Sequence, residues 1–200
     1  MKSLYMDTTG QGVELLFKAG AREVHCADEG RQSERIFAAI EKVLGGAKIS
    51  DLDFVVVITG PGSFTGIRLG LAIAKGFGIA ARVPVFGLDR FRAIWISNRK
   101  AGRIEIPAGK SEVYVADMDA DGNELAPPKL KKVISTSSFR PASTPQAGRA
   151  REPESRNNQS QSDIAIDPIA VLEYVEKAGV APAPLAPLYI KPHYAKVPQK

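Results

Sequence analysis

The chain has 200 residues, 44% of them hydrophobic and 24% charged, and its formal net charge is +5. This is the composition of a soluble protein long enough for one domain or two small packed lobes. A single cysteine, Cys26, excludes an intrachain disulfide, and the isolated His25 and His193 form no zinc-ligand motif. The N-terminus lacks a leader-like apolar segment and apolar runs such as 54–58 are too short to span a bilayer, so we expect a cytoplasmic protein without membrane contact.

The first hundred residues predict the element order β-β-β-α-β-α-β-α, a mixed sheet with helices on its faces. Three short strands of an antiparallel meander are expected at residues 4–6, 13–17 and 23–27. Residues 33–44 have apolar positions at helical spacing, and Gly45-Gly46 ends that helix. The continuous apolar run 53–59 predicts a strand covered on both faces. A helix to Ala81, a strand at 83–88 and a helix at 89–99 are expected to follow.

The second hundred residues predict a smaller lobe. A hairpin is expected at 103–106 and 112–118, then a turn at 119–123, a strand at 131–134, a helix at 168–178 and a strand-like triplet at 188–190. Residues 140–163 contain no Val, Ile, Leu, Met or aromatic residue, which predicts a flexible polar insertion. The expected organisation is therefore an N-terminal lobe over residues 1–101 and a C-terminal lobe over residues 102–200.

Residues 59–70, with the sequence TGPGSFTGIRLG, join a buried strand to a helix N-terminus. Such a turn is a ready anion site, because free amides and the helix dipole point at it. The segment lacks the lysine of a Walker A loop, so a tight turn capped by Ser63 or Thr65 is an equal alternative. Asp7-Thr8-Thr9 is likewise consistent with a metal–phosphate contact or with an Asx turn. The residues of the possible vestigial phosphate site are Asp7, Thr8, Thr9, Gly60, Gly62 and Ser63.

Small residues recur every fourth position along the helix that follows, at Gly66, Gly70, Ala74 and Gly78. Each helical glycine costs about 1 kcal/mol relative to alanine, so a close approach of another backbone should offset it. We expect internal packing for part of this stripe and a subunit interface for the rest. No Ser/His/Asp set, Cys–His pair or convergent carboxylate pair can be assembled, so no catalytic residues are predicted.

The glycine-rich segment carries a resemblance to a known family. Residues 60–70, GPGSFTGIRLG, match the GPGSFTGxRxG motif of the TsaB/YeaZ family. Asp7-Thr8-Thr9 resembles the end of the family's opening strand, and residues 83–88 resemble the strand that follows the glycine-rich helix. Glu112-Val113-Tyr114 resembles the family's GEVY hairpin, with Ser111 in place of the glycine, and residues 188–191 resemble its closing segment. The matches are dense over residues 1–100 and sparse beyond.

The resemblance implies an α/β, actin-like ATPase fold of the RNase H-like kind. It implies two lobes, each with a mixed β-sheet flanked by helices, the second lobe being abbreviated. It further implies a non-catalytic scaffold subunit in the synthesis of threonylcarbamoyladenosine in the tRNA anticodon loop. Such a subunit dimerises with a TsaD-type catalytic subunit and helps to recruit a TsaE-type ATPase. ATP and metal are then expected on the partner subunits, with no cofactor held tightly by this chain and tRNA contacted through the complex.

Three departures from the family pattern bear on the site. TsaD carries a metal-binding histidine pair after the strand equivalent to 83–88, where this chain reads Asp89-Arg90-Phe91-Arg92-Ala93. The family usually has a histidine before its first helix, where this chain has Gln32. The missing histidine pair is consistent with a non-catalytic subunit, which is a homodimer or a monomer when free. Gln32, together with a polar insertion where the family has a glycine-containing loop near 140–160, argues against a nucleotide site between the lobes and favours packing over a phosphate loop at 60–66.

The scaffold hypothesis places a dimer interface on the helix at 33–44 and on the glycine-striped helix that ends near Ala81, so that Gly70→Glu should abolish partner binding. The predicted interface residues are Ile36, Ile40, Gly66, Ile67, Gly70, Ala74 and Phe77. Two alternatives are an ATPase or small-molecule kinase that uses Asp7 and the loop 60–66, and a metallopeptidase, for which this chain lacks the ligands.

Overall fold

The computed structural model describes residues 1–109, 111–133, 165–178 and 185–190. Its elements in chain order are β1 (Lys2–Asp7), β2 (Gly12–Ala19), β3 (Arg22–Glu29), α1 (Gln32–Leu44), the 3-10 helix η1 (Ile49–Asp51), β4 (Phe54–Ile58), α2 (Phe64–Ala81), β5 (Val85–Leu88), α3 (Arg90–Asn98), β6 (Gly102–Pro107), β7 (Glu112–Met118), β8 (Lys129–Lys132) and α4 (Pro168–Ala178). The order predicted for the first hundred residues is confirmed, with η1 as an unpredicted addition.

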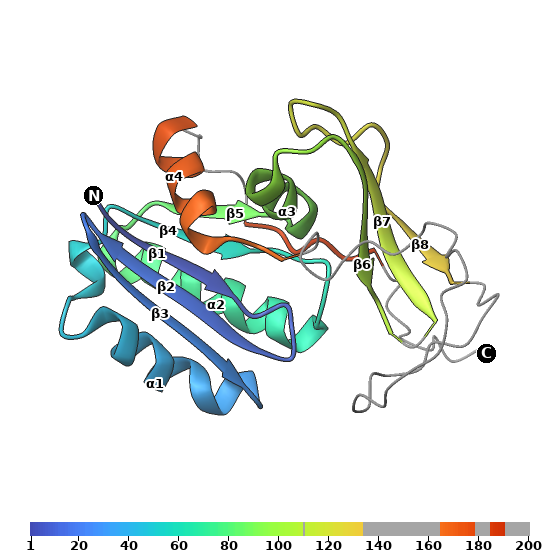
Figure 1. The fold of residues 1–200 in the computed structure, drawn as a ribbon. Helices are drawn as coiled ribbons and strands as arrows, with labels where there is room; N and C mark the ends of the chain where they lie inside the picture. The colour runs from blue at the N-terminus through green and yellow to red at the C-terminus, as the bar shows by residue number, and fades with distance from the viewer. Residues whose placement is uncertain (110, 134–164, 179–184, 191–200) are drawn as a thin grey trace, which may run out of the picture.

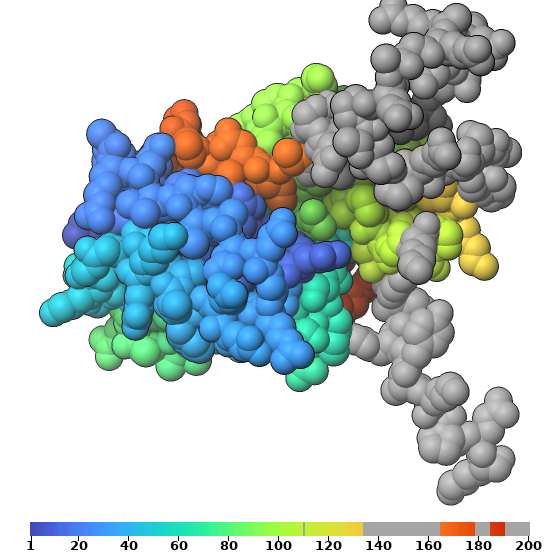
Figure 2. Space-filling view, turned by 60° about the horizontal axis from the view of Figure 1, so that its bottom comes forward, coloured from blue at the N-terminus to red at the C-terminus, as the bar shows by residue number. Residues whose placement is uncertain are grey.

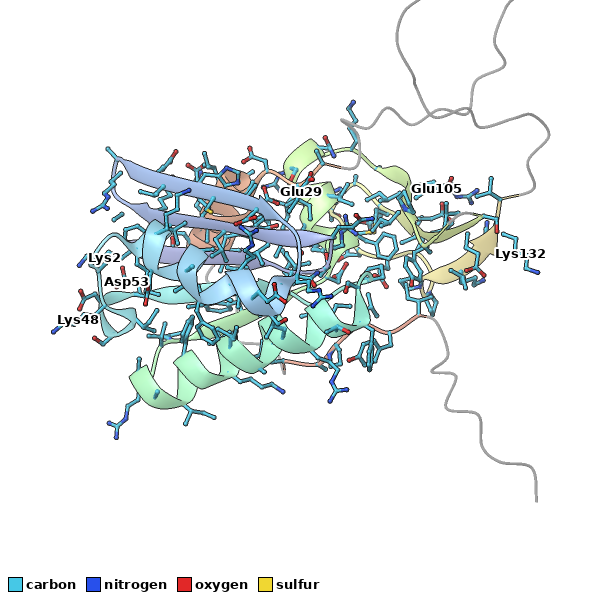
Figure 3. The ribbon with its side chains drawn as sticks, turned by 90° about the horizontal axis from the view of Figure 1, so that it is seen from below. Lys2, Glu29, Lys48, Asp53, Glu105 and Lys132 are labelled. Atoms are coloured by element: carbon cyan, nitrogen blue, oxygen red, sulfur yellow. The ribbon has the colours of Figure 1, made fainter. Side chains whose placement is uncertain are left out.

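The first sheet has five strands in the order β3-β2-β1-β4-β5 (Figure 1). β1, β2 and β3 form the predicted antiparallel meander, whereas β1 and β4, and β4 and β5, pair in parallel. All five residues of β4 are buried, because helices cover both faces of the sheet there. At the start of β1, the Lys2 amide donates to a carboxylate oxygen of Asp53 at 2.6 Å, and Figure 3 shows the two residues together at this edge.

α1 and α2 lie side by side on one face of this sheet (Figure 3). Their apolar stripes and the facing sheet residues form one hydrophobic core, which includes Ile36, Ile40, Ile67 and Ala74. α1 ends at Gly45 in the left-handed conformation, φ 54°, as the Gly-Gly pair predicts. These four core residues, which were expected at a dimer interface, therefore pack inside the chain.

The opposite face of the first sheet packs against α3, α4 and the second sheet. Side chains from all of these elements form a second core, which includes Tyr5, Phe91, Ile106 and Leu172. α4 comes from the second half of the chain, yet it contacts β1 and β2 and lies across the N-terminal strands in Figure 2.

The second sheet has the order β6-β7-β8 and is antiparallel throughout the described residues, whereas a mixed sheet was expected. The short connections between these strands explain the difference, because a parallel neighbour needs a crossover of about a dozen residues or more. β8 begins at Lys129 rather than at residue 131. The predicted insertion at 140–163 lies outside the described residues.

Residues 188–190 form no strand, although a strand-like triplet was expected there. The Leu188 amide donates to the Thr59 carbonyl at 2.8 Å, just beyond the end of β4. Leu185 packs with the first core, and Leu188 and Ile190 pack with the second. The segment 185–190 therefore passes the β4–β5 side of the sheet from one core to the other, with the Leu188–Thr59 hydrogen bond joining it to the end of β4.

α2 has 18 residues and a mean hydropathy of 1.3, so it meets the length and composition of a membrane-crossing helix, although it is only 33% buried. The expectation that every apolar segment is too short for this was therefore wrong. A helix that packs on a protein core meets the same criterion, and α2 contacts β4, β5 and α1.

Arg92 in α3 holds three parts of the second core together. Its guanidinium donates to the Tyr174 hydroxyl of α4 at 2.7 Å and to the carbonyls of Asp121 and Gly122 in the loop after β7. The same group lies over the Trp95 ring, 4.7 Å from its centroid. One side chain thus joins α3, α4 and the second sheet.

We expect Arg92→Ala to lower the free energy of unfolding by about 2 kcal/mol, because it removes a cation–π contact and the donor to the Asp121 and Gly122 carbonyls and the Tyr174 hydroxyl. Urea unfolding followed by circular dichroism measures the change. Arg31→Ala is the control, since Arg31 has an 84% exposed side chain whose ion pair is with the exposed Glu34. Equal unfolding curves for the two variants would contradict a joining role for Arg92.

Candidate functional site

The carboxyl ends of β1 and β4 meet at the N-terminus of α2, and this junction contains all six residues of the predicted phosphate site. The Ser63 amide donates to the Thr9 carbonyl at 2.7 Å. The Thr8 hydroxyl donates to the Gly66 carbonyl at 2.7 Å and is fully buried. The segment Asp7-Thr8-Thr9 therefore lies directly against the glycine-rich loop, as parallel neighbouring strands require.

Both local turn interpretations match the geometry. The Asp7 carboxylate accepts a hydrogen bond from the Thr9 amide at 2.7 Å, which is an Asx turn. The Ser63 hydroxyl accepts from the Gly66 amide at 3.2 Å and caps α2. In both hydrogen bonds, polar groups of the junction are paired with other groups of the same chain.

The glycines of the loop make room for the end of β1. A Cβ atom on Gly62 would overlap the Thr9 carbonyl, one on Gly66 the Thr8 carbonyl, and one on Gly70 the Thr8 hydroxyl. The space beside each of these glycines is thus filled by protein, and no lysine follows the loop as it does in a Walker A segment. This arrangement fits close backbone packing between the loop and the end of β1.

Gln32 is a junction residue that the pattern of the sequence alone does not reveal. Its side-chain amide donates to the Gly10 carbonyl at 2.8 Å and to the Thr8 carbonyl at 3.3 Å. The residue stands where the TsaB/YeaZ pattern has a histidine, and that departure was the one available signal. Gln32 therefore connects the start of α1 to the end of β1.

The start of α3 completes the junction. The Arg90 amide donates to the Gly60 carbonyl at 2.7 Å, and the Arg90 guanidinium lies 3.5 Å from the Pro61 carbonyl. Asp89 caps α3, because its carboxylate accepts from the Arg92 amide at 2.9 Å. Burial raises the pKa of Asp89 above its ordinary value of 3.8, although amide donors, that of Arg92 first, oppose this.

Because the folded-state pKa of Asp89 is raised, the folded chain holds this proton more tightly than the unfolded chain does. Stability from this group is therefore lost as pH rises from about 4 through the folded-state pKa. Asp89→Asn keeps a capping oxygen but does not titrate. We therefore expect the free energy of unfolding of this variant to rise relative to that of the parent as the pH goes from about 4 to about 7. Urea unfolding at both pH values measures this difference, and a relative loss over that interval would contradict it. Asp89→Ala removes the helix cap and should lower the free energy of unfolding by about 1 kcal/mol at both pH values.

Other titratable groups lie on β1, β2 and β3 near the junction. His25 on β3 pairs with Glu14 on β2 at 3.0 Å. Burial raises the pKa of Glu14 and also that of the fully buried Tyr5 hydroxyl, which lies near the Asp7 and Glu14 carboxylates. Within the described ranges, no group of three or more His, Cys, Asp and Glu side chains is placed to hold a metal ion.

Most of the predicted interface residues lie inside the chain. The buried ones are Ile36, Ile40, Gly66, Ile67, Gly70 and Ala74, whereas Phe77 is partly buried. Since Gly70 packs on Thr8, Gly70→Glu would test folding and not an interface. The exposed large apolar side chains of the same helices are different ones: Phe37 on α1, and Phe64 and Ile79 on α2.

The chain resembles known proteins in sequence and in structure. Residues 29–166 match the family described as TsaD: tRNA N6-adenosine threonylcarbamoyltransferase. The Escherichia coli tRNA threonylcarbamoyladenosine biosynthesis protein TsaB is 30% identical over 137 residues, which are 62% of this chain and 58% of that protein. The chain thus spans less than two thirds of the length of this relative. An uncharacterised Mycobacterium tuberculosis protein is 29% identical over 174 residues, 84% of this chain and 79% of its own.

A solved structure of YeaZ from Pseudomonas aeruginosa has the same fold. It aligns over 94% of this chain and 99% of its own with a TM-score of 0.63, at 17% sequence identity. The predicted actin-like fold is therefore confirmed. Together with the matched family region and the GPGSFTGIRLG segment, these findings show that the chain belongs to the TsaD family and, within it, to the TsaB/YeaZ proteins.

Proposed function

We propose that this protein is a scaffold subunit in the synthesis of threonylcarbamoyladenosine in tRNA. It binds a TsaD-type catalytic subunit and, with it, helps to recruit a TsaE-type ATPase in the cytoplasm. The transfer chemistry, ATP and metal belong to the partner subunits. The name of the E. coli relative and the matched family support the pathway, and the close packing around Gly62, Gly66 and Gly70 supports a supporting role over a nucleotide-cleaving one.

The observation that carries the scaffold proposal is the outer face of α2. This helix is as apolar as a membrane-crossing one but is only 33% buried. Ile79 is 83% exposed, Phe64 is 40% exposed, and Phe37 on the adjacent α1 is 63% exposed. A partner that covers α1 and α2 would bury these apolar side chains, and this burial would favour association. We therefore place the interface on the outer faces of α1 and α2, beside the buried residues that the sequence indicated.

The test combines binding and activity. Purified chain is mixed with the TsaD-type subunit of the same organism, and the mass of the product is measured by light scattering. Threonylcarbamoylation of an unmodified tRNA transcript is then measured with and without the chain. The proposal predicts a one-to-one complex and activity that depends on the chain. Separate species and unchanged activity would reject it, and tight binding of ATP·Mg by the isolated chain would favour an ATPase instead.

A further inference from the structure

We propose that the surface around Arg99, at the C-terminal end of α3, binds phosphate groups of RNA. The inference rests on the proposed function, since it makes this chain a direct contact of the tRNA substrate. It concerns a surface away from the α1–α2 interface and the glycine-rich loop. We call it the Arg99 surface and define it by Arg99, Lys100, Arg103 and Lys177.

Two hollows flank Arg99. One, of about 490 Å³, lies between α3 and α4 and is lined by Ser97, Arg99, Tyr174 and Lys177, among others. The other, of about 160 Å³, lies between the end of α3 and β6 and is lined by Trp95, Lys100 and Arg103, among others. Each hollow therefore presents two basic side chains at the same end of α3.

The Arg99 guanidinium is held in place by aromatic rings. It lies 4.9 Å from the Trp95 ring centroid and 5.0 Å from that of Tyr174, so its planar group is fixed between two elements. Within the described residues it donates no hydrogen bond, and the residue is exposed. An oriented guanidinium with unused N–H donors can bind a phosphate group through two parallel hydrogen bonds, in a bidentate contact.

The charge of the hollows remains positive after their internal ion pairs are counted. Glu173 is the acidic residue among the lining side chains of the two hollows, and its carboxylate lies 3.0 Å from Lys18 and 3.7 Å from Lys177. Arg103 pairs with Asp117 at 2.9 Å. Arg99 and Lys100 thus remain as adjacent positive charges without a carboxylate partner among the described residues.

A chain of phosphates suits this surface better than an isolated anion does. The basic groups lie in two neighbouring hollows, so they can contact more than one phosphate of a single strand. Contacts of this kind give an affinity that falls steeply with salt, because each neutralised phosphate releases counterions. An acidic protein segment could use the same donors, and the experiment separates the two.

The test uses Arg99→Gly with Arg82→Gly as a matched control. Arg82 follows α2 as Arg99 follows α3, and both have a left-handed backbone, with φ of 57° and 53°. Glycine is favoured in that conformation, so both variants should fold and each loses one exposed positive charge. Binding of a fluorescent unmodified tRNA transcript is measured by anisotropy over a salt series, for the chain with its TsaD-type partner.

We expect Arg99→Gly to weaken tRNA binding about tenfold and to reduce the slope against salt by about one, with no change for Arg82→Gly. Lys100→Ala should act in the same direction. Equal effects of the Arg99 and Arg82 variants, or no effect of either, would overturn the inference. Loss of partner binding with unchanged tRNA binding would assign the Arg99 surface to an acidic protein instead. If the parent chain supports modification but Arg99→Gly leaves tRNA binding intact, this inference alone fails and the proposed function stands.

Discussion

Gly66→Ala is expected to lower the free energy of unfolding by about 3 kcal/mol, although alanine is the better helix former. A Cβ atom on Gly66 would overlap the Thr8 carbonyl oxygen, which belongs to the backbone just after β1 and cannot rotate away. The overlap must push α2 away from the sheet or distort the end of β1. Either movement opens the first core, in which Ile67 and Leu71 of α2 pack.

Gly76→Ala in the same helix is the matched control. No atom lies within 4 Å of a Cβ built on Gly76, so this substitution gains helix propensity without a clash. It should raise the free energy of unfolding by about 0.5–1 kcal/mol. Urea unfolding of the parent and the two variants measures both changes. Similar stability of the two variants would mean that the junction of β1 and α2 yields easily, contrary to the packing described above.

Ile79→Glu is expected to weaken binding to the TsaD-type subunit by about 100-fold or more while the chain stays folded. Ile79 is 83% exposed, so the free energy of unfolding should change by no more than about 0.5 kcal/mol. In a complex that covers α2, however, the new carboxylate would be buried without a partner, which is costly. Calorimetric titration of the chain with the partner subunit measures the affinity.

Leu125→Glu serves as the control for this experiment. Leu125 is also an exposed aliphatic residue, 67% accessible, but it lies in the loop between β7 and β8. It should leave partner binding unchanged. If Leu125→Glu weakened binding as much as Ile79→Glu, the contact would extend over the second sheet, and the assignment to α1 and α2 would be wrong.

Local sequence patterns predict most of the elements of this chain. α1, α3 and β4 lie within about two residues of their expected bounds and α2 ends at Ala81 as expected, because apolar period, helix caps and glycine stops are local signals. The position of α4 on β1 and β2 was not predictable in this way. An amphipathic pattern shows which face of a helix is buried but does not identify the surface that it meets.

The candidate site was predictable in part for the same reason. The meeting of Asp7-Thr8-Thr9 with the loop 60–66 follows from two adjacent parallel strands. The packing of Gly66 and Gly70 against Thr8 could not be predicted. A stripe of small residues permits a close approach by a segment of the same chain or by another chain alike. The contacts of Gln32 and Arg90 with backbone carbonyls depend on tertiary structure, so no local pattern reveals them.

The position of α4 also has a consequence for the folding of this protein during its synthesis on the ribosome. Tyr5 of β1 and Leu16 of β2 belong to the same core as Val171 and Leu172 of α4, which contacts both strands and is made more than a hundred residues later. Until α4 leaves the exit tunnel, that apolar face of the nascent sheet has no helical cover on its β1–β2 side. A stretch of exposed hydrophobic surface on an incomplete chain is what chaperones bind and what aggregates form from. Truncation before residue 168 should therefore yield an insoluble chain and not a stable N-terminal lobe.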